Sequence, residues 1–381
     1  MNLIPYSRQW IDEEDINEVI KALKSDFITQ GPKVIEFETK LAKYCGAKYA
    51  VVFNSGTSAL HAAYFASGLK ESDEFITSPN TFVATSNAGI YLGAKPVFVD
   101  IEEDTGNIDA LRIEEKITKR TKIIVPVHYS GHPVDLEKIS EIAKKYNLLV
   151  IEDACHAIGS KYREVNVGNC KYSDMTVFSF HPVKNITTGE GGAVLANNDT
   201  YYEKLNMFRT HGITKKEFFN TPDGDWYYEM QFLGYNYRMT DIQSALGLSQ
   251  LKKVDKFTKR RREIADIYNK AFRDNPYFDI PIEEDYAYSS YHLYPIRLKD
   301  DFKNNKREIF SKLKEKRLGV QVHYIPVYLQ PYYQQFGFRK GICPKAEVFY
   351  QREISIPLYQ SMTADEINYV IETILKIFKT L

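Results

Sequence analysis

The chain opens with apolar residues at the spacing of an α-helix. Asp12 stands before the first set as a candidate N-cap, and Asp15 follows three residues later, as in a capping box. The two helically spaced sets are Ile16, Val19, Ile20 and Leu23, then Val34, Phe37 and Leu41. We therefore predict two amphipathic helices at the start of the chain.

Short apolar runs replace this pattern from Tyr49 onward. They occupy residues 50–53, 75–76, 97–99, 123–127 and 148–151, and two more follow at 175–180 and 193–196. Helical stretches separate them, for example residues 136–146 with Ile139, Ile142 and Ala143 on one face. This alternation predicts an α/β domain with a mostly parallel sheet flanked by helices.

The second half of the chain has a different pattern. Residues 214–236 are polar and aromatic without a clear period, which predicts an ordered loop of a kind that is often functional. Thr240 caps a helical segment that runs toward Phe272, and the composition changes near Lys252. Further strands are predicted at 293–298 and 320–322, and further helices at 306–317 and 363–378. We therefore divide the chain into an N-terminal segment with a large domain, residues 1–251, and a small C-terminal α+β domain, residues 252–381.

The charge balance excludes functions that need a strong electrostatic field. Fifty lysine and arginine residues balance fifty aspartate and glutamate residues, so no positive field exists to hold nucleic acid or an anionic membrane. The basic run at 252–262 lies in a predicted amphipathic helix and is expected to be a solvated face. Affinity for a partner must therefore come from a local site.

The cysteines and the first residues bear on the compartment. The four cysteines are scattered without a Cys-x-x-Cys pair, which is typical of reduced thiols. The opening residues, MNLIPYSRQWIDEED, turn acidic early and contain no long apolar stretch. We therefore expect neither a signal peptide nor a spanning helix, and a cytoplasmic protein.

A glycine-rich stretch carries the first candidate for chemistry. In the run at 178–192, FSFHPVKNITTGEGG, Lys184 follows a strand that reads as buried and precedes a glycine-rich turn. A lysine in that place loses hydration, which lowers its pKa and frees the amine to form an imine. Taken alone, an ordinary surface lysine is the more common explanation.

Two other segments supply polar partners for a ligand with a ring nitrogen and a phosphate. The strand NLLVIED ends in Asp153, at the carboxyl edge of a parallel sheet, where α/β sites form. Residues 52–60, VFNSGTSAL, lead from a strand through small residues into a helix whose first N–H groups can seat a phosphate. The run is neither a P-loop nor a dinucleotide fingerprint. Together with Lys184, these segments supply every polar contact that pyridoxal 5'-phosphate needs.

In this order, the motifs resemble the DegT/DnrJ/EryC1/StrS family of sugar aminotransferases, a branch of the fold-type I pyridoxal phosphate enzymes. The likeness covers nearly the whole chain. It is carried by NSGTSAL, PNTFVAT, PVHYSGHPVDL, EDACHAIGS, FSFHPVKNITTGEGGAV, RTHG, GYNYRMTDIQSALGLSQL and VHYIPVY. The resemblance implies an α/β aminotransferase with pyridoxal 5'-phosphate as its cofactor.

The resemblance also assigns roles around the cofactor. Lys184 matches the catalytic lysine that forms the Schiff base, and Asp153 matches the acid at the ring nitrogen. Phe82 matches the aromatic residue that stacks on the pyridine ring, although core packing is the commoner role of a phenylalanine. The phosphate contacts are matched by Gly56, Thr57, Ser58 and Ser179, and by Asn236 from the neighbouring subunit. A homodimer with shared active sites is therefore expected.

Other matched positions lie in the substrate pocket. His156 stands where many relatives carry glutamine near the phenolic oxygen of the cofactor; either side chain can hydrogen-bond there, and an imidazole can also titrate near neutrality. Its detailed role stays open. His323 and Tyr324 match residues that line the sugar-nucleotide pocket, and Tyr6 matches an N-terminal residue near the substrate.

The likeness is greatest to one branch of the family. The runs ITTGEGGAV, RTHGITKK, IQSALGLSQLKK and HLYPI resemble enzymes of bacterial pseudaminic acid synthesis. The resemblance implies L-glutamate as amino donor and C4 of a UDP-linked 4-keto-6-deoxy-N-acetyl-amino sugar as acceptor. Amination at C3, and dTDP- or GDP-linked sugars, stay open because pocket shape decides between them.

Particular residues disfavour other functions. The family's sugar 3-dehydratases carry histidine where this chain has Lys184. A metal hydrolase would use His128, His132 and His156, but four-residue spacing co-orients ligands only on a helix and Gly131 marks a loop. No metal is expected. A regulator that binds pyridoxal phosphate would need a DNA-binding segment, and the sequence shows neither a helix-turn-helix pattern nor a basic patch.

Overall fold

The structure is a computed structural model that describes residues 2–380. The two predicted N-terminal helices are confirmed as α1 (Glu13–Leu23) and α2 (Pro32–Cys45). The Asp12 side chain accepts the N–H of Asp15, and the Asp15 carboxylate accepts the N–H of Asp12. This reciprocal capping box fixes where the first helix begins.

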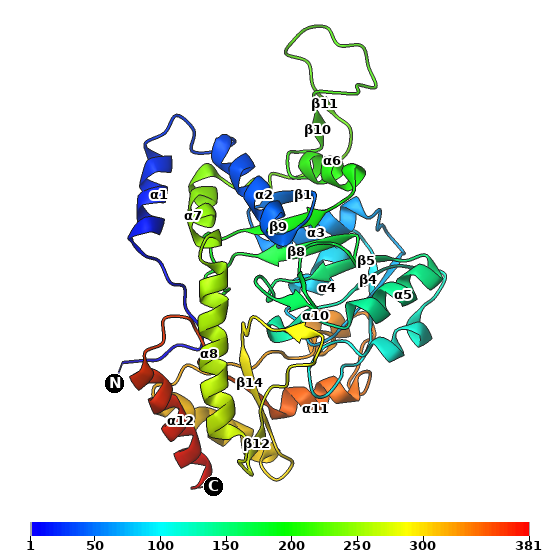
Figure 1. The fold of residues 1–381 in the computed structure, drawn as a ribbon. Helices are drawn as coiled ribbons and strands as arrows, with labels where there is room; N and C mark the ends of the chain where they lie inside the picture. The colour runs from blue at the N-terminus through cyan, green and yellow to red at the C-terminus, as the bar shows by residue number, and fades with distance from the viewer. Residues whose placement is uncertain (1, 381) are drawn as a thin grey trace.

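A seven-stranded sheet forms the centre of the molecule (Figure 1). Its strands are β1 Tyr49–Phe53, β2 Glu74–Thr77, β3 Lys95–Phe98, β4 Thr121–Val125, β5 Leu149–Asp153, β8 Met175–Ser179 and β9 Gly192–Ala196. They lie in the order β1-β9-β8-β5-β4-β2-β3. β9 runs antiparallel to both of its neighbours, and the other pairs are parallel. The prediction of a mostly parallel sheet is confirmed.

Helices cover both faces of this sheet because its strands are apolar on both sides. They are α2, α3 Gly56–Ala66, α4 Ala84–Ile90, α5 Leu136–Tyr146, α6 Asp199–Phe208 and α7 Asp241–Leu251. Along β1, Val51 and Phe53 pack in one buried cluster with α3 and α6, whereas Ala50 and Val52 pack in another with α2 and α7. Successive side chains of a strand thus serve opposite layers. Among residues 2–380, no helix combines the length and apolar character needed to cross a membrane.

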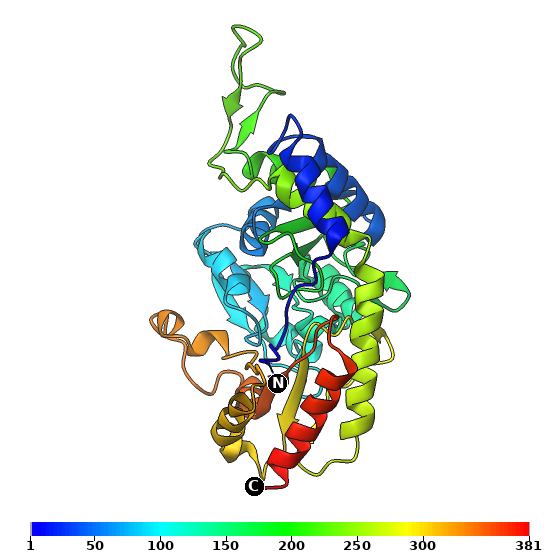
Figure 2. The ribbon, with the colours of Figure 1, turned by 90° about the vertical axis from the view of Figure 1, so that its left-hand side faces the viewer.

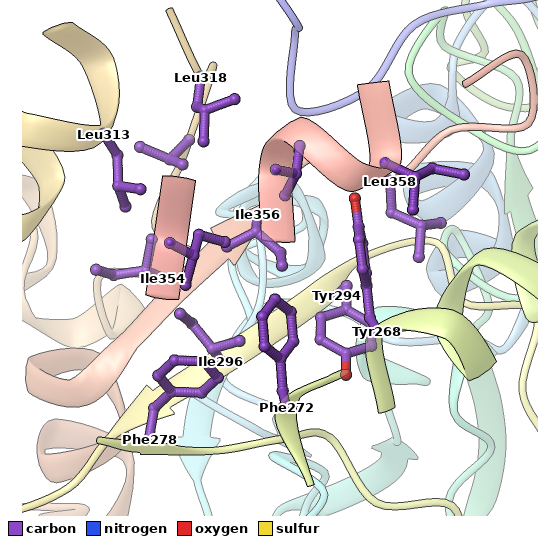
Figure 3. Packing of buried hydrophobic residues seen from close by; sticks show 14 of the residues in the cluster. Tyr268, Phe272, Phe278, Tyr294, Ile296, Leu313, Leu318, Ile354, Ile356 and Leu358 are labelled. Carbon is purple, nitrogen blue, oxygen red and sulfur yellow. The ribbon is translucent and has the colours of Figure 1, made fainter. Parts of the chain in front are cut away.

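The C-terminal part has a sheet and a core of its own, as the α+β pattern predicts. Its strands are β12 Phe278–Asp279, β14 Tyr294–Leu298 and β15 Glu353–Ile356, and its helices are α8 Val254–Phe272, α9 Lys306–Glu315, α10 Pro331–Gln334, α11 Pro344–Arg352 and α12 Ala364–Phe378. Figure 3 shows Phe272 of α8 within the buried cluster that also contains Phe278, Tyr294 and Ile356. A small sheet of β6 (Lys161–Tyr162), β7 (Val165–Asn166) and β13 (Ala287–Tyr288) joins the two parts.

The helical segment after Thr240 differs in one detail from the prediction. Thr240 does cap it, but the helix ends at Leu251, and α8 begins only at Val254. The start of α8 packs with the large-sheet cluster and its end packs in the C-terminal core. Because α8 packs against both parts of the chain, it does not mark where one part ends, and the domain boundary at residue 252 stays a prediction.

The strand predicted at residues 320–322 is wrong. This segment forms no strand; Gln321 makes a single bridge to Ser355 of β15. The two residues exchange backbone hydrogen bonds of 3.2 and 2.8 Å. Residues 320–322 thus lie beside the C-terminal sheet without extending it; Val320 packs in the C-terminal core, whereas Gln321 and Val322 line a cavity.

Residues 213–236 form a hairpin, which we call the arm, that projects from the body (Figures 1 and 2). At its base, β10 (Ile213–Thr214) pairs antiparallel with β11 (Glu229–Met230). The Glu229 carboxylate accepts the N–H groups of Phe219 and Asn220, both at 2.7 Å. These bonds order the loop beyond the strands, so the predicted ordered loop is confirmed and is a hairpin.

Candidate active site

The N-terminus of α3 faces a cavity at the carboxyl edge of the large sheet. Ser55 is the N-cap, and its hydroxyl accepts the N–H of Ser58. A Cβ on Gly56 would lie 2.9 Å from the Cβ of Ser179, closer than real Cβ atoms approach, so a glycine is required for this contact with β8. Because the first N–H groups of a helix have no intrahelical acceptor, this end of α3 can bind an anion.

Asp153 ends β5 beside this helix terminus, and its orientation is fixed by two donors. The Thr85 hydroxyl donates to Oδ2 at 2.6 Å, and the Cys155 N–H donates to Oδ1 at 3.1 Å. Thr85 is itself held by the hydroxyl of Thr81 at 2.7 Å. The carboxylate is therefore presented to the cavity in one orientation, suited to a fixed cationic or N–H group of a ligand.

Lys184 lies in the tight segment that follows β8. Its N–H donates to the carbonyl of His181 at 2.9 Å, and the Thr188 N–H donates back to Phe180 at 3.0 Å. Burial lowers the pKa of Lys184, while the nearby Cys155 and Asp153 act in the opposite direction. Its amine is therefore more readily deprotonated, and hence more nucleophilic near neutral pH, than that of a surface lysine.

These groups share one cavity of about 600 Å³ between the two parts of the chain. Among the residues that line it are ten that the sequence singled out: Tyr6, Gly56, Thr57, Phe82, Asp153, His156, Ser179, Lys184, His323 and Tyr324. Phe82 is 58% exposed, so it is not the core residue that its type alone would suggest. Its ring is available to stack on a flat ligand.

His156 and Tyr324 form one wall of the cavity. The imidazole Nε2 lies 3.0 Å from the Tyr324 hydroxyl, whereas Nδ1 is buried and has no hydrogen-bond partner within residues 2–380. Burial, and then Lys184 and His323, lower the pKa of His156 well below its usual range. The imidazole therefore does not titrate near neutrality, and its Nδ1 is a buried polar atom whose partner the protein does not supply within residues 2–380.

The structure leaves two of the predicted residues outside the cavity lining. The Ser58 hydroxyl donates to Asn54 Oδ1 at 2.6 Å and takes part in the capping box, and its contact with the phosphate stays a prediction. Asn236 lies at the end of the arm, where its carbonyl accepts from the Asn54 side chain at 3.4 Å. Its proposed role toward a neighbouring subunit stays a prediction.

Several lining residues were missed from the sequence. They are Thr81, Thr85, His181, Glu190, Gln321 and Val322, with a few apolar neighbours. Thr85 stands within the quoted PNTFVAT motif, so the motif itself was the available signal. Thr81, His181, Glu190 and Val322 also stand within quoted motifs, and only Gln321 lies outside them.

The histidines of the alternative metal site are engaged elsewhere. His128 Nε2 lies 2.7 Å from Glu152, and its Nδ1 accepts the Val134 N–H. His132 Nε2 accepts the N–H of Glu284 at 3.0 Å. Within residues 2–380, no group of three or more histidine, cysteine or acidic side chains could hold a metal ion.

The residues of the cavity fit pyridoxal 5'-phosphate. The α3 terminus with Thr57 and Ser179 can seat its phosphate, and Asp153 can pair with its ring nitrogen. Lys184 supplies the amine that captures its aldehyde. The orphaned Nδ1 of His156 indicates that a polar ligand atom is expected at this wall.

Known proteins resemble the chain over its whole length. The DegT/DnrJ/EryC1/StrS aminotransferase family matches residues 9–375. A Campylobacter jejuni protein, UDP-4-amino-4,6-dideoxy-N-acetyl-beta-L-altrosamine transaminase, is 44% identical over 99% of this chain and 98% of its own. Helicobacter pylori PseC, an aminotransferase involved in pseudoaminic acid biosynthesis, is 39% identical with a TM-score of 0.93 over 100% of both chains. The PLP form of Streptococcus pneumoniae Spr1654, described as a sugar aminotransferase, is 32% identical with a TM-score of 0.92 over 99% of both.

Proposed function

Since the chain belongs to the DegT/DnrJ/EryC1/StrS aminotransferase family, we propose that it transfers an amino group from L-glutamate to C4 of a UDP-linked 4-keto-6-deoxy-N-acetyl-amino sugar. The reaction would serve pseudaminic acid or a related surface glycan. The observation that carries the proposal is the convergence of Lys184, Asp153 and the α3 terminus on one cavity. The substrate rests on the full-length similarity to the C. jejuni transaminase and to PseC.

The family's cofactor, pyridoxal 5'-phosphate, supplies an electron sink that makes the Cα–H bond of an amino donor acidic. Asp153 sustains this property because a carboxylate against the ring nitrogen keeps that nitrogen protonated. Thr85 keeps the carboxylate in place through its 2.6 Å hydrogen bond. Phe82 lines the cavity with an exposed ring and would cover one face of the cofactor, which would exclude water from that face.

Lys184 has two tasks in this proposal. Its amine would hold the cofactor until the amino donor takes its place. The free amine would then take the proton from the donor Cα as general base and give it up again as general acid. The lowered pKa of Lys184 suits both steps, because a base works best when its pKa lies near the working pH.

The same cavity must accept two substrates in turn. Glutamate enters and leaves as 2-oxoglutarate before the keto-sugar arrives, so we expect ping-pong kinetics. Tyr6, His323 and Tyr324 line the side of the cavity contributed by the two ends of the chain. We assign this side to the sugar nucleotide.

We further propose a homodimer in which Asn236 reaches the cofactor phosphate of the partner. The arm supports this because it exposes large apolar side chains, namely Phe219, Trp226, Tyr228, Met230 and Leu233. A cytoplasmic location is part of the proposal, supported by four free cysteines.

The substrate is tested by product analysis. The purified enzyme with L-glutamate is offered UDP-, dTDP- and GDP-linked keto-sugars, and the position of the new amine is read by NMR. We expect turnover of the UDP-linked 4-keto sugar with nitrogen at C4. A preference for another nucleotide, or nitrogen at C3, would refute the proposed substrate and leave the aminotransferase assignment standing.

A further inference from the structure

A chain of buried hydrogen bonds lies directly behind the cavity wall. His323 Nδ1 is 2.8 Å from the Ser355 hydroxyl, and that hydroxyl is 2.5 Å from Glu353 Oε1. The backbone N–H of His323 donates to the other carboxyl oxygen, Oε2, at 2.7 Å. Glu353 and Ser355 are fully buried, and His323 is 8% exposed. The imidazole is thus connected to a carboxyl group that no solvent reaches.

The surrounding backbone holds this chain in register. Gln321 and Ser355 exchange backbone hydrogen bonds, and the Tyr129 hydroxyl donates to the carbonyl of His323 at 2.7 Å. With Nδ1 engaged by Ser355, Nε2 is the ring nitrogen left to a ligand, since it has no hydrogen-bond partner within residues 2–380. His323 also lines the cavity.

The geometry allows only two proton arrangements. When Glu353 is ionised, both of its oxygens accept, so the Ser355 hydroxyl donates to Oε1 and must accept from Nδ1–H. His323 Nε2 then carries no proton and is an acceptor. When Glu353 is protonated, the proton sits on Oε1, because Oε2 accepts the His323 N–H. Ser355 then accepts from Oε1–H and donates to Nδ1, which places the ring proton on Nε2.

We propose that the protonation state of Glu353, relayed by Ser355, decides whether His323 presents a hydrogen-bond acceptor or a donor to the cavity. Glu353 and Ser355 are then positioning residues that act through His323. The carboxyl group never touches the substrate. It changes whether His323, in the cavity wall that the substrate touches, offers a hydrogen-bond donor or an acceptor.

The environment of His323 permits such a switch. Burial, and then Lys184, lower the pKa of His323 to about 3, so the imidazole is neutral near pH 7. A neutral imidazole has one proton to place on either nitrogen, and its neighbours decide which. The assignment of the proton follows from the hydrogen bonds of the ring.

Several charged and titratable groups around Glu353 bear on the pKa of its carboxyl group. Burial raises its pKa, and Lys306 on α9 opposes this effect without removing it. Arg297 stands opposite Glu353 in the register of β14 and β15. Tyr129, on the side of the large domain, has its pKa raised first by burial and then by Glu353. The pKa of Tyr324, next to His323 in the chain, is raised first by burial and then by several neighbours, of which Tyr6 contributes most and Glu353 least, and both phenols stay neutral.

The proposal is tested on the pyridoxal phosphate-loaded enzyme with ¹⁵N-labelled histidine, because ¹⁵N shifts distinguish Nδ1–H from Nε2–H. In the wild type, His323 is expected to carry Nε2–H at low pH and Nδ1–H at high pH, with a midpoint above the ordinary pKa of glutamate, about 4.3. In Glu353→Gln the amide oxygen accepts the His323 N–H and the amide group donates to Ser355. This variant should therefore keep Nε2–H at every pH.

Two further variants complete the design. Ser355→Ala interrupts the relay and should abolish the pH dependence of the tautomer even if Glu353→Gln fails to fold. Glu347→Gln is the matched control, since this buried carboxylate bonds the Tyr328 hydroxyl at 2.6 Å away from the cavity. It should leave the His323 tautomer as in the wild type. A His323 that keeps one tautomer across the pH range in the wild type, or Nδ1–H in Glu353→Gln, would overturn the proposal.

The consequence for catalysis rests on the proposed function. The KM of the keto-sugar should follow the tautomer, changing about fivefold across the midpoint, as expected for one hydrogen bond gained or lost. The fivefold change should be absent from Glu353→Gln and Ser355→Ala. If the tautomer switches but no keto-sugar is accepted, the relay stands and the proposed substrate fails.

Discussion

At Lys184, burial and charge act in opposite directions. Burial in the cavity wall lowers the pKa of the amine, and the neighbouring Cys155 and Asp153 raise it without cancelling the effect. Asp153 itself cannot turn away, because Thr85 and the Cys155 N–H hold both of its oxygens. One carboxylate therefore tunes the lysine and, in the proposed complex, the cofactor ring.

This balance predicts the pH dependence of cofactor capture. The unprotonated amine is the reactive form, so the rate at which apoenzyme captures pyridoxal phosphate should rise with pH. The rate should reach its plateau at a pH below the pKa of a free lysine, which is about 10.4. Asp153→Asn removes a charge that raises the Lys184 pKa, so the rise should move to lower pH. Stopped-flow absorbance across pH checks this, and a rise at the free-lysine pKa in both proteins would contradict it.

The place of a residue in the site could be predicted where a motif and its chemistry coincide. Lys184 and Asp153 were expected in one site, and the structure brings them to one cavity. The role of Ser58 stays a prediction, because a serine at this position can either cap its own helix or face a ligand. Thr85 was missed because its bond to Asp153 joins residues 68 positions apart.

At the scale of elements, the start of α3 depends on close packing against β8 and β9. A Cβ on Gly56 would lie 2.9 Å from Ser179, and one on Gly192 would lie 2.5 Å from the Ser55 carbonyl oxygen. Helix starts with such caps were predictable, because the signals are local. The single bridge that Gln321 makes was not predictable, because a short apolar run does not show how many residues of a neighbouring strand it can pair with.

Gly56→Ala should therefore weaken cofactor binding. The added methyl forces the α3 terminus away from Ser179, which misplaces the N–H groups assigned to the phosphate. We expect the Kd for pyridoxal phosphate to rise about tenfold or more, which corresponds to about 1.4 kcal/mol. Fluorescence titration of apoenzyme measures it. Ser67→Ala at the other end of α3 is the control, and an unchanged Kd in Gly56→Ala would contradict the assigned phosphate seat.

The arm allows a prediction about assembly. Trp226 is 74% exposed in one chain, and burial of such a side chain in a subunit contact stabilises the contact. Trp226→Ser should shift the concentration dependence of dimerisation toward monomer in analytical ultracentrifugation. Leu111→Ser, at a site 81% exposed and outside the arm, should have no such effect. Equal behaviour of the two variants would exclude the arm from the interface.

At the scale of the whole molecule, the cavity lies between two packed bodies. The large sheet carries Lys184 and Asp153, and the C-terminal part contributes His323 and Tyr324. Sequence patterns predicted both parts, because each has its own periodicity. They did not predict which residues meet across the cavity, since that depends on how the parts pack together.

The C-terminal core should control stability separately from chemistry. Phe272 is fully buried, with its ring 5.3 Å from that of Phe278 (Figure 3). Phe272→Ala should lower the free energy of unfolding by about 3–5 kcal/mol. Denaturant unfolding of the apoenzyme measures this loss. A loss below about 1 kcal/mol would contradict the close packing of this core.

The central claim is that Lys184 holds pyridoxal phosphate and that the bound cofactor shuttles nitrogen from glutamate to a nucleotide keto-sugar. Its most direct test is the visible absorbance of purified wild type and Lys184→Ala, before and after L-glutamate and then a UDP-4-keto sugar. The account predicts a band of lysine-bound cofactor in the wild type that glutamate bleaches and the sugar restores. The variant should lack this band. A wild type that never forms the band with added pyridoxal phosphate would contradict the account, and a band that no keto-sugar restores would contradict the acceptor alone.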